Sequence, residues 1–229
     1  MTETTTGPSR RFLKTRQREW AGNLARRLAQ MGATPNMVSV AGIVCAFLAG
    51  LAFMSVTPDT AHPARFWIIG AAFVQLRLLC NMLDGLLAIE GGMKGKLGDL
   101  WNDIPDRLSD SFILVGAGYS VEWLVPGGSA LGWCAALFAM MTAYVRTLGG
   151  ALGTPQYFTG PMAKQHRMFV ITLGALFAAF QTSSFQAKSW AMESARPGWA
   201  MAPALIVIVL GSAVTVVRRI ELVARDLSA

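Results

Sequence analysis

A stretch between positions 77 and 110 concentrates side chains that can bind metal ions and phosphate groups. It reads RLLCNMLDGLLAIEGGMKGKLGDLWNDIPDRLSD and joins two apolar segments through a glycine-rich turn. On a helix, at about 100° per residue, one stripe before the turn lies within about 60° and contains Arg77, Asn81, Asp84 and Ala88. A second stripe after the turn lies within roughly 100° and contains Asp99, Asn102, Asp103, Asp106 and Asp110. Two stripes joined by a short loop can face each other.

These carboxylates would repel one another at the adjoining ends of two helices unless a cation lay among them. Aspartate carboxylates and asparagine carbonyls are hard oxygen ligands, which suit Mg²⁺, Mn²⁺ or Ca²⁺ better than zinc. The alternative is that they cap or solvate a helix end, and Asp99 and Asp103 fit that alternative near the start of a helix. Asp84 and Asp106 fit it less well, because carboxylates at membrane depth persist mainly at functional sites. The pattern therefore favours a divalent metal site.

Glycines at positions 85, 91, 92, 95 and 98 bracket the same place. A glycine-rich loop by itself usually indicates only a turn. Here Gly85 directly follows Asp84, and Gly98 lies where the chain enters the next helix. A nucleotide or phosphate group could therefore approach the backbone closely at these two positions.

The elements that position these residues are predicted to cross a membrane. Of 229 residues, 53% are hydrophobic and 14% are charged, whereas soluble domains average about 25% charged residues. Since about 20 residues cross a hydrocarbon core, we expect five spans at residues 37–56, 66–89, 130–148, 168–181 and 199–217. A sixth run, 111–119, follows the acidic stripe, and we expect it to span as well because intramembrane carboxylates face functional cavities. The predicted fold class is all-α: a polytopic membrane protein with six transmembrane helices.

The segment before the first span is expected to lie on the membrane surface. Trp20, Leu24, Leu28 and Met31 recur at helical spacing among arginines, which is typical of an interfacial amphipathic helix. The alternative is a solvated basic leader. Pro35 then indicates a break before the first span. We therefore divide the chain into residues 1–33, an N-terminal segment with an interfacial helix, and residues 34–229, one six-helix transmembrane domain.

The distribution of charge predicts the topology. Lys and Arg outnumber Asp and Glu by 20 to 13, and six spans place most of them on one side, in the N-terminal segment, two loops and the C-terminal tail. Cytoplasmic loops carry excess Lys and Arg, so both termini and the polar site are predicted to be cytoplasmic in a bacterial inner membrane. Cys45, Cys80 and Cys134 lie inside apolar runs without a CxxC pair, which indicates neither a disulfide framework nor a zinc site.

The stretch around the turn resembles the signature of the CDP-alcohol phosphotransferases, D-x2-D-G-x2-A-R-x8-G-x3-D-x3-D. The spacing is kept at all eight positions, and five of them match: Asp84, Gly85, Ala88, Gly98 and Asp106. The TPNMVS segment before the first span, and the Arg146 region with GPMAK at 160–164, also resemble this family. The resemblance thus covers most of residues 34–170.

Three signature positions depart from the pattern. Asn81 and Asn102 replace the first and third aspartates, and Ile89 replaces the arginine. The paired asparagines resemble a variant bacterial branch of the family; they keep two oxygens but remove two negative charges, so metal affinity should fall. Arg77 could supply the missing cation, the alternative being a snorkelling interfacial arginine. The nearby carboxylates at positions 99, 103 and 110 could restore ligand charge.

The resemblance implies a homodimer that uses one or two Mg²⁺ or Mn²⁺ ions and transfers a phosphoalcohol group from a CDP-linked donor to an acceptor alcohol, releasing CMP. It implies the metal ligands Asn81, Asp84, Asn102 and Asp106, with Asp106 also the catalytic base. It further implies the donor-binding residues Arg77, Gly85, Ala88 and Gly98. We expect CDP-diacylglycerol as donor, with a CDP-linked head group as the alternative, and no nucleic-acid partner.

A second cationic cluster lies near the expected loop between the fourth and fifth spans. Lys164, His166 and Arg167, together with Arg146, could bind an acceptor phosphate or a lipid phosphate, although the topology alone would also place basic residues there. Two other functions remain open: a catalytically degenerate homologue that binds lipid or nucleotide as a regulatory partner, and a small cation-coupled transporter. Carboxylates gathered at one face, without a repeated half that has broken helices, disfavour transport.

Overall fold

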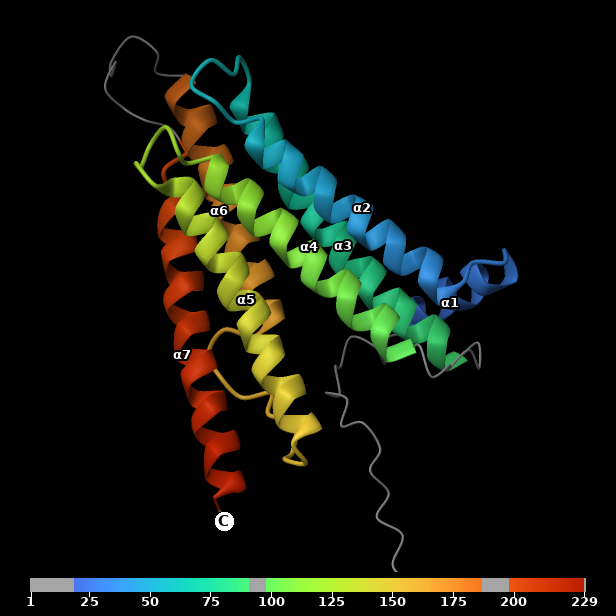
Figure 1. Ribbon diagram of the computed structural model, residues 1–229. Helices are drawn as coiled ribbons and strands as arrows, with labels where there is room; N and C mark the ends of the chain where they lie inside the picture. The colour runs from blue at the N-terminus through green and yellow to red at the C-terminus, as the bar shows by residue number, and fades with distance from the viewer. Residues whose placement is uncertain (1–18, 91–97, 187–197, 229) are drawn as a thin grey trace, which may run out of the picture.

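The computed structural model describes residues 19–90, 98–186 and 198–228, and the regular secondary structure within these ranges is helical. Seven helices follow in chain order: α1 (Glu19–Gln30), α2 (Pro35–Met54), α3 (Pro63–Glu90), α4 (Gly98–Tyr119), α5 (Gly128–Ala151), α6 (Lys164–Gln186) and α7 (Met201–Leu227). Figure 1 shows α2, α3 and α4 running side by side, with α5, α6 and α7 forming the rest of the bundle. The all-α prediction is confirmed.

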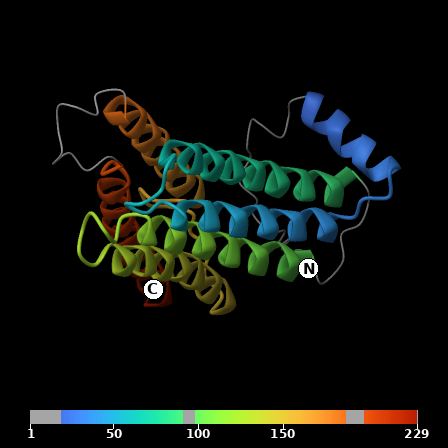
Figure 2. The same cartoon turned by 90° about the horizontal axis from the view of Figure 1, so that it is seen from above.

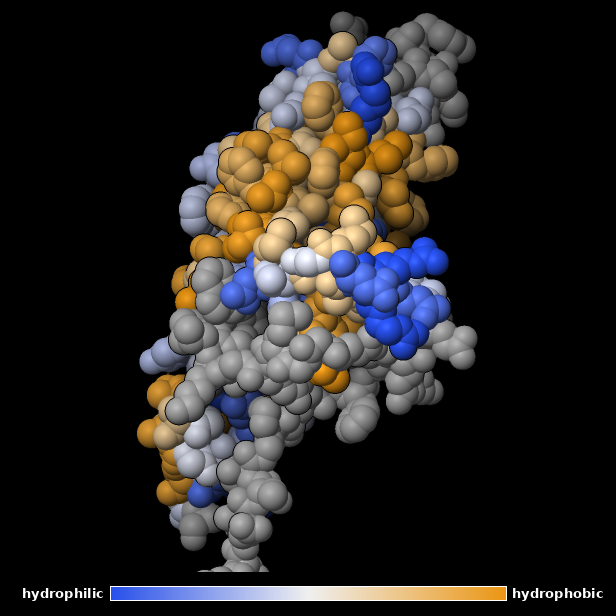
Figure 3. Space-filling view, turned by 90° about the vertical axis from the view of Figure 1, so that its right-hand side faces the viewer, coloured by the Kyte–Doolittle hydropathy of each residue, from blue (hydrophilic) through white to orange (hydrophobic). Residues whose placement is uncertain are grey.

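Four of the described helices, α2, α3, α5 and α7, are long and apolar enough to cross a membrane. The prediction of an integral membrane protein agrees with this finding. One face of the molecule carries a broad hydrophobic zone with hydrophilic surface above and below it (Figure 3). Helices α4 and α6 have 22 and 23 residues, similar to the others, but they carry many of the polar groups of the candidate site.

Short α1 lies across the end of the bundle, where it packs on α3 (Figures 1 and 2). Its Ala21 and Ala25 are fully buried in a small apolar cluster with Leu83, Leu86 and Leu87. The opposite face of α1 carries the exposed side chains of Asn23, Arg26 and Arg27. This packing fixes the end of α3 from which the signature residues project.

The chain turns into α2 at the predicted break. The hydroxyl of Thr34 accepts a hydrogen bond from the backbone N–H of Met37 at 3.3 Å, and Pro35 occupies the first helical position. Both features satisfy a helix start, because the first backbone N–H groups have no partner within the helix and proline lacks one. The start of α2 is therefore determined locally.

Glycines allow α4 to pack closely against its neighbours. A Cβ added to Gly116 would lie 2.4 Å from the backbone oxygen of Gly50 in α2, and one added to Gly118 would lie 2.6 Å from the Cα of Gly132 in α5. Small residues at such crossings let helix backbones approach each other, as is common in membranes. The close packing holds α4, which carries Asp106, against both α2 and α5.

Candidate active site

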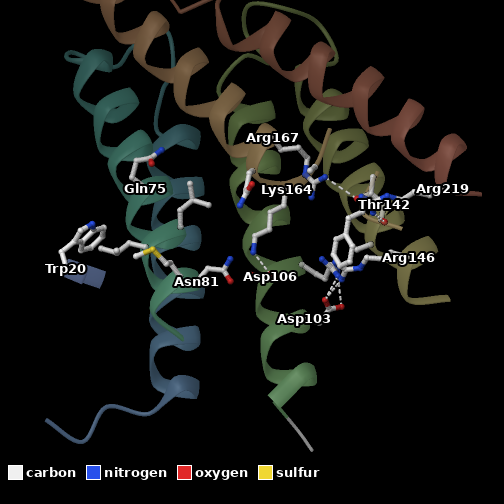
Figure 4. A pocket seen from close by; sticks show the side chains of 18 residues that line it. Trp20, Gln75, Asn81, Asp103, Asp106, Thr142, Arg146, Lys164, Arg167 and Arg219 are labelled. Atoms are coloured by element: carbon white, nitrogen blue, oxygen red, sulfur yellow. Dashed lines mark hydrogen bonds and ion pairs between the residues drawn. The ribbon is translucent and has the colours of Figure 1, made fainter. Parts of the chain in front are cut away.

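A cavity of about 540 Å³ opens between α3, α4 and the α5–α6 region. Side chains from α1, α3, α4, α5, α6, α7 and the loop before α6 line it (Figure 4). Five residues predicted from the sequence to form the site meet there: Asn81, Asp106, Arg146, Lys164 and Arg167. They come from four helices, so the cavity exists only in the folded bundle.

Asp106 lies at the centre of the charged groups in this cavity. Its side chain is 18% exposed, and it forms ion pairs with Lys164 and, at 3.2 Å, with the Nη2 of Arg77. Lys164 extends from the start of α6 toward Asp106 (Figure 4). The carboxylate predicted to be both ligand and base is thus accessible and balanced by two cations.

Asp84 lies deeper, on α3. Its Oδ2 accepts a hydrogen bond of 2.9 Å from the hydroxyl of Ser39, whereas its Oδ1 is buried without a hydrogen-bond partner. Ser39 is the last residue of the TPNMVS segment, whose resemblance to the family was visible in the sequence, but the contact itself was not predicted. A buried carboxylate oxygen without a donor is costly unless a cation approaches it.

The oxygen donors fit the predicted divalent ion. Asp84 offers an unpartnered oxygen, Asp106 offers a carboxylate to the cavity, and Asn81 lines the same cavity with its amide. The backbone of Asn102 lies in the first turns of α4, but its side chain is outside the described residues. Among the described residues, the oxygen donors at this site are the carboxylates of Asp84 and Asp106 and the amide of Asn81, and no three Asp, Glu, His or Cys side chains gather at one point.

The remaining donor-site candidates lie along the two helix ends. Gly85 is buried and Ala88 half-buried on α3, and Gly98 begins α4. Neither Gly85 nor Ala88 is among the residues that line the cavity. Arg77 is buried, with only 1% of its side chain exposed, and lies behind the cavity wall, where it contacts Asp106 and Asp110. It therefore contacts the carboxylates themselves, as a snorkelling arginine would not.

Cations occupy the opposite wall. Arg146 donates to Asp103 at 3.2 Å, and its guanidinium carbon lies 5.0 Å from the centre of the Phe158 ring. Arg167 is buried, donating to Asp110 at 2.8 Å and to the carbonyl of Met162 at 3.1 Å. Exposed His166 is not a lining residue. Of the predicted phosphate-binding residues, Arg146 and Lys164 thus face the cavity most directly (Figure 4).

The loop that leads to Lys164 is attached to α7. Arg219 of α7 donates to the carbonyl of Thr159 at 3.0 Å, and the backbone N–H of Met162 donates to Thr215 at 3.0 Å. The hydroxyl of Tyr157, in the same loop, donates a hydrogen bond to Asp226 near the end of α7, and this hydrogen bond raises the pKa of the tyrosine. These contacts fix the start of α6 relative to the cavity.

Several lining residues were not predicted as site residues. Arg219 counted in the sequence only as a topology signal, yet it is 6% exposed and lines the cavity. Trp20, Thr142 and Phe158 also line it. A buried arginine in an apolar helix is the one signal that could have indicated Arg219, because charged groups inside a membrane face a polar cavity.

Comparisons with known proteins relate the chain to phospholipid synthases. No model of a protein family matches it. It is 27% identical over 205 residues to the phosphatidylinositol phosphate synthase of Mycobacteroides abscessus, covering 87% of this chain and 81% of that protein. It is also 27% identical over 158 residues to the archaetidylinositol phosphate synthase of Pyrococcus horikoshii, covering 68% of this chain and 76% of that protein.

Solved structures show the same fold. The phosphatidylinositol phosphate synthase of Mycobacterium tuberculosis in complex with manganese and citrate superposes with a TM-score of 0.70 at 20% identity, covering 89% of this chain and 88% of that one. The same synthase with CDP-DAG bound gives a TM-score of 0.69, covering 89% and 92%. The chain therefore has the same α-helical fold as these structures.

The resemblance to the CDP-alcohol phosphotransferases that the signature predicts is confirmed by these similarities. The assignment of the paired asparagines at positions 81 and 102 to a variant branch of the family stays a prediction from the sequence.

Proposed function

We propose that the protein transfers a substituted phosphate group from CDP-diacylglycerol to an acceptor alcohol and releases CMP. The observation that carries the proposal is that Asp106 and Asn81, at two positions of the signature, line the same cavity as the cations Arg146 and Lys164. Relatives named for the synthesis of inositol phospholipids, one of them solved with CDP-DAG bound, support this donor.

The residues Asp84, Asp106, Asn81 and Asn102 would hold one or two Mg²⁺ or Mn²⁺ ions. When bound, such an ion would neutralise pyrophosphate charge as a Lewis acid, and the solved relative with manganese supports this assignment. The hydrogen bond from Ser39 orients Asp84 so that its other oxygen remains available.

The acceptor hydroxyl attacks the phosphorus that carries the diacylglycerol group, and its proton passes to Asp106. As the new P–O bond forms, the bond from that phosphorus to the oxygen of CMP breaks, and CMP leaves with that oxygen. Lys164 and Arg146 stabilise the charge that develops on the phosphate oxygens, which is how phosphoryl transfer is mainly accelerated. Gly85, Ala88 and Gly98 let the donor approach the helix ends closely.

We further propose that the acceptor carries a phosphate group. Arg146 lies under Phe158 and contacts the partly exposed Asp103, and Lys164 lies at the same wall. Guanidinium and ammonium groups in such a position bind a phosphate dianion well. The named products of the relatives, phosphatidylinositol phosphate and archaetidylinositol phosphate, support an acceptor of this kind.

In the membrane, we propose six spans, α2 to α7, with α1 at the interface and the cavity and both termini cytoplasmic. The lengths of α4 and α6 support this count, since 22 and 23 residues suffice to cross. The Lys and Arg distribution supports the orientation. A C-terminal reporter that is active only outside the cytoplasm would reject it. Residues 1–33 and 34–229 would then be the surface segment and the transmembrane domain, and a homodimer is expected from the family resemblance.

The test is CMP release by the full-length protein in nanodiscs. CDP-diacylglycerol is supplied with Mg²⁺ or Mn²⁺ and a panel of alcohols, each with and without a phosphate group, and the lipid products are identified by mass spectrometry. We expect one phosphorylated alcohol to give CMP and a matching phospholipid. Donor binding without CMP release from any acceptor would refute the proposal.

A further inference from the structure

Asp110 is a buried carboxylate between two guanidinium groups. It lies one turn after Asp106 on α4 and is 4% exposed. Its Oδ1 accepts from the Nη2 of Arg77 at 3.0 Å, and its Oδ2 accepts from the Nη2 of Arg167 at 2.8 Å. Both oxygens are therefore occupied, and the residue does not line the cavity. Asp110 is thus poorly placed to restore ligand charge directly.

The same cations surround the proposed ligand and base. The Nη2 of Arg77 is shared, lying 3.0 Å from Asp110 and 3.2 Å from Asp106. Lys164 pairs with the other oxygen of Asp106. The connected group therefore contains two carboxylates and three cations. Buried charges need counter-charges nearby, so Asp106 would become the nearest carboxylate for Arg77 if Asp110 were neutral.

We propose that Asp110 is a positioning residue: it shares Arg77 with Asp106 and keeps Arg167 paired with itself, so that the two guanidinium charges do not fall on Asp106 alone and Asp106 keeps enough negative charge to bind a divalent cation. The inference rests on the proposed metal site at Asp84 and Asp106. It also gives the buried guanidinium of Arg167 a role distinct from phosphate binding: its contacts with Asp110 and the carbonyl of Met162 anchor the start of α6.

The experiment measures Mn²⁺ binding by the full-length protein in nanodiscs, from the loss of the free-ion signal in electron paramagnetic resonance. Substitution of a residue that contacts a metal ligand commonly lowers metal affinity by about 10- to 100-fold. We expect Asp110→Asn to weaken Mn²⁺ binding by a factor of this size. Asp110→Glu keeps the charge and should bind within about threefold of the wild type by the same reasoning.

A second pair of variants separates charge from structure. Asp110→Asn combined with Arg167→Gln restores the charge balance and should recover most of the affinity. Arg167→Gln alone leaves Asp110 free to take Arg77, so Mn²⁺ should bind at least as tightly as in the wild type. A purely structural role predicts weaker binding in both, because each removes another contact of the network.

The outcomes distinguish this inference from the proposed function. If the wild type binds Mn²⁺ and Asp84→Ala abolishes that binding, the metal site stands. In that case, unchanged Mn²⁺ affinity in Asp110→Asn, or weaker Mn²⁺ binding in Arg167→Gln, overturns the proposed role of Asp110 and leaves the metal site standing. If the wild type binds no Mn²⁺ at a site that depends on Asp84, the proposed metal site fails and the inference fails with it.

Discussion

Replacing Asp106 by asparagine tests the proposed chemistry most directly. The substitution keeps the shape and one oxygen of the side chain but removes the negative charge and the proton acceptor. In the wild type the carboxylate pairs with Lys164 and with Arg77. Arg77 retains Asp110 as a partner after the change, so the local packing should persist while the centre of the cavity loses its charge.

The expected size follows from these contacts. Loss of a general base lowers turnover by about 10²- to 10⁴-fold, and the lower limit corresponds to about 2.7 kcal/mol of transition-state stabilisation. The Lys164 and Asp106 side chains are 21% and 18% exposed, so losing their ion pair should cost about 1–2 kcal/mol of stability, between the surface and buried cases. Turnover should therefore fall much more than the stability of the fold.

The assay measures CMP release and the donor-dependent thermal shift in the same nanodisc preparation. Asp59→Asn makes the same chemical change at an exposed position in the loop between α2 and α3 and serves as the control. We expect Asp106→Asn to lose at least about 100-fold in turnover and to keep most of the shift with CDP-diacylglycerol. Wild-type turnover in Asp106→Asn would show that another group is the base.

The metal, packing and loop contacts give three further expectations. Asp84→Ala should lower CMP release by at least about 100-fold, whereas Asn81→Asp restores a carboxylate and should retain activity. Full activity of Asp84→Ala in the presence of a chelator would exclude the metal site. Gly116→Ala places a Cβ 2.4 Å from a backbone oxygen of α2 and should destabilise the protein by about 1–3 kcal/mol, measured by thermal unfolding. Its control, Gly150→Ala, meets only a flexible side chain at 3.1 Å and should change the stability little. Backbone hydrogen bonds from Ser129 and Gly127 lower the pKa of Glu122, so its stabilisation is present at neutral pH and is lost as the pH falls through that lowered pKa. Glu122→Gln should therefore reduce the fall of the melting temperature with pH below about pH 5, and an unchanged pH profile would contradict this.

The sequence was sufficient to predict the helices. Each predicted span corresponds to a helix, although the boundaries moved: residues 111–119 are the second half of α4, and residues 199–217 continue to Leu227 in α7. Apolar runs, a proline at a helix start and a basic amphipathic segment are local features, so each is readable without knowing its neighbours. The spacing of the signature likewise pointed to Asp84 and Asp106, because helical periodicity places residues of one stripe on one face.

The partners of those residues were decided by the tertiary structure. Ser39 lies 45 positions from Asp84, and Arg167 lies 57 positions from Asp110. Helical periodicity determines the face on which a side chain lies, but it carries no information about which other helix packs against that face or at what height. The sequence alone therefore determined that this is a helical membrane protein with a carboxylate stripe beside a basic cluster. Only the packing of α3, α4, α6 and α7 determined that Arg77 and Arg167 share Asp110, and that Arg219 is buried in the bundle rather than in a solvated tail.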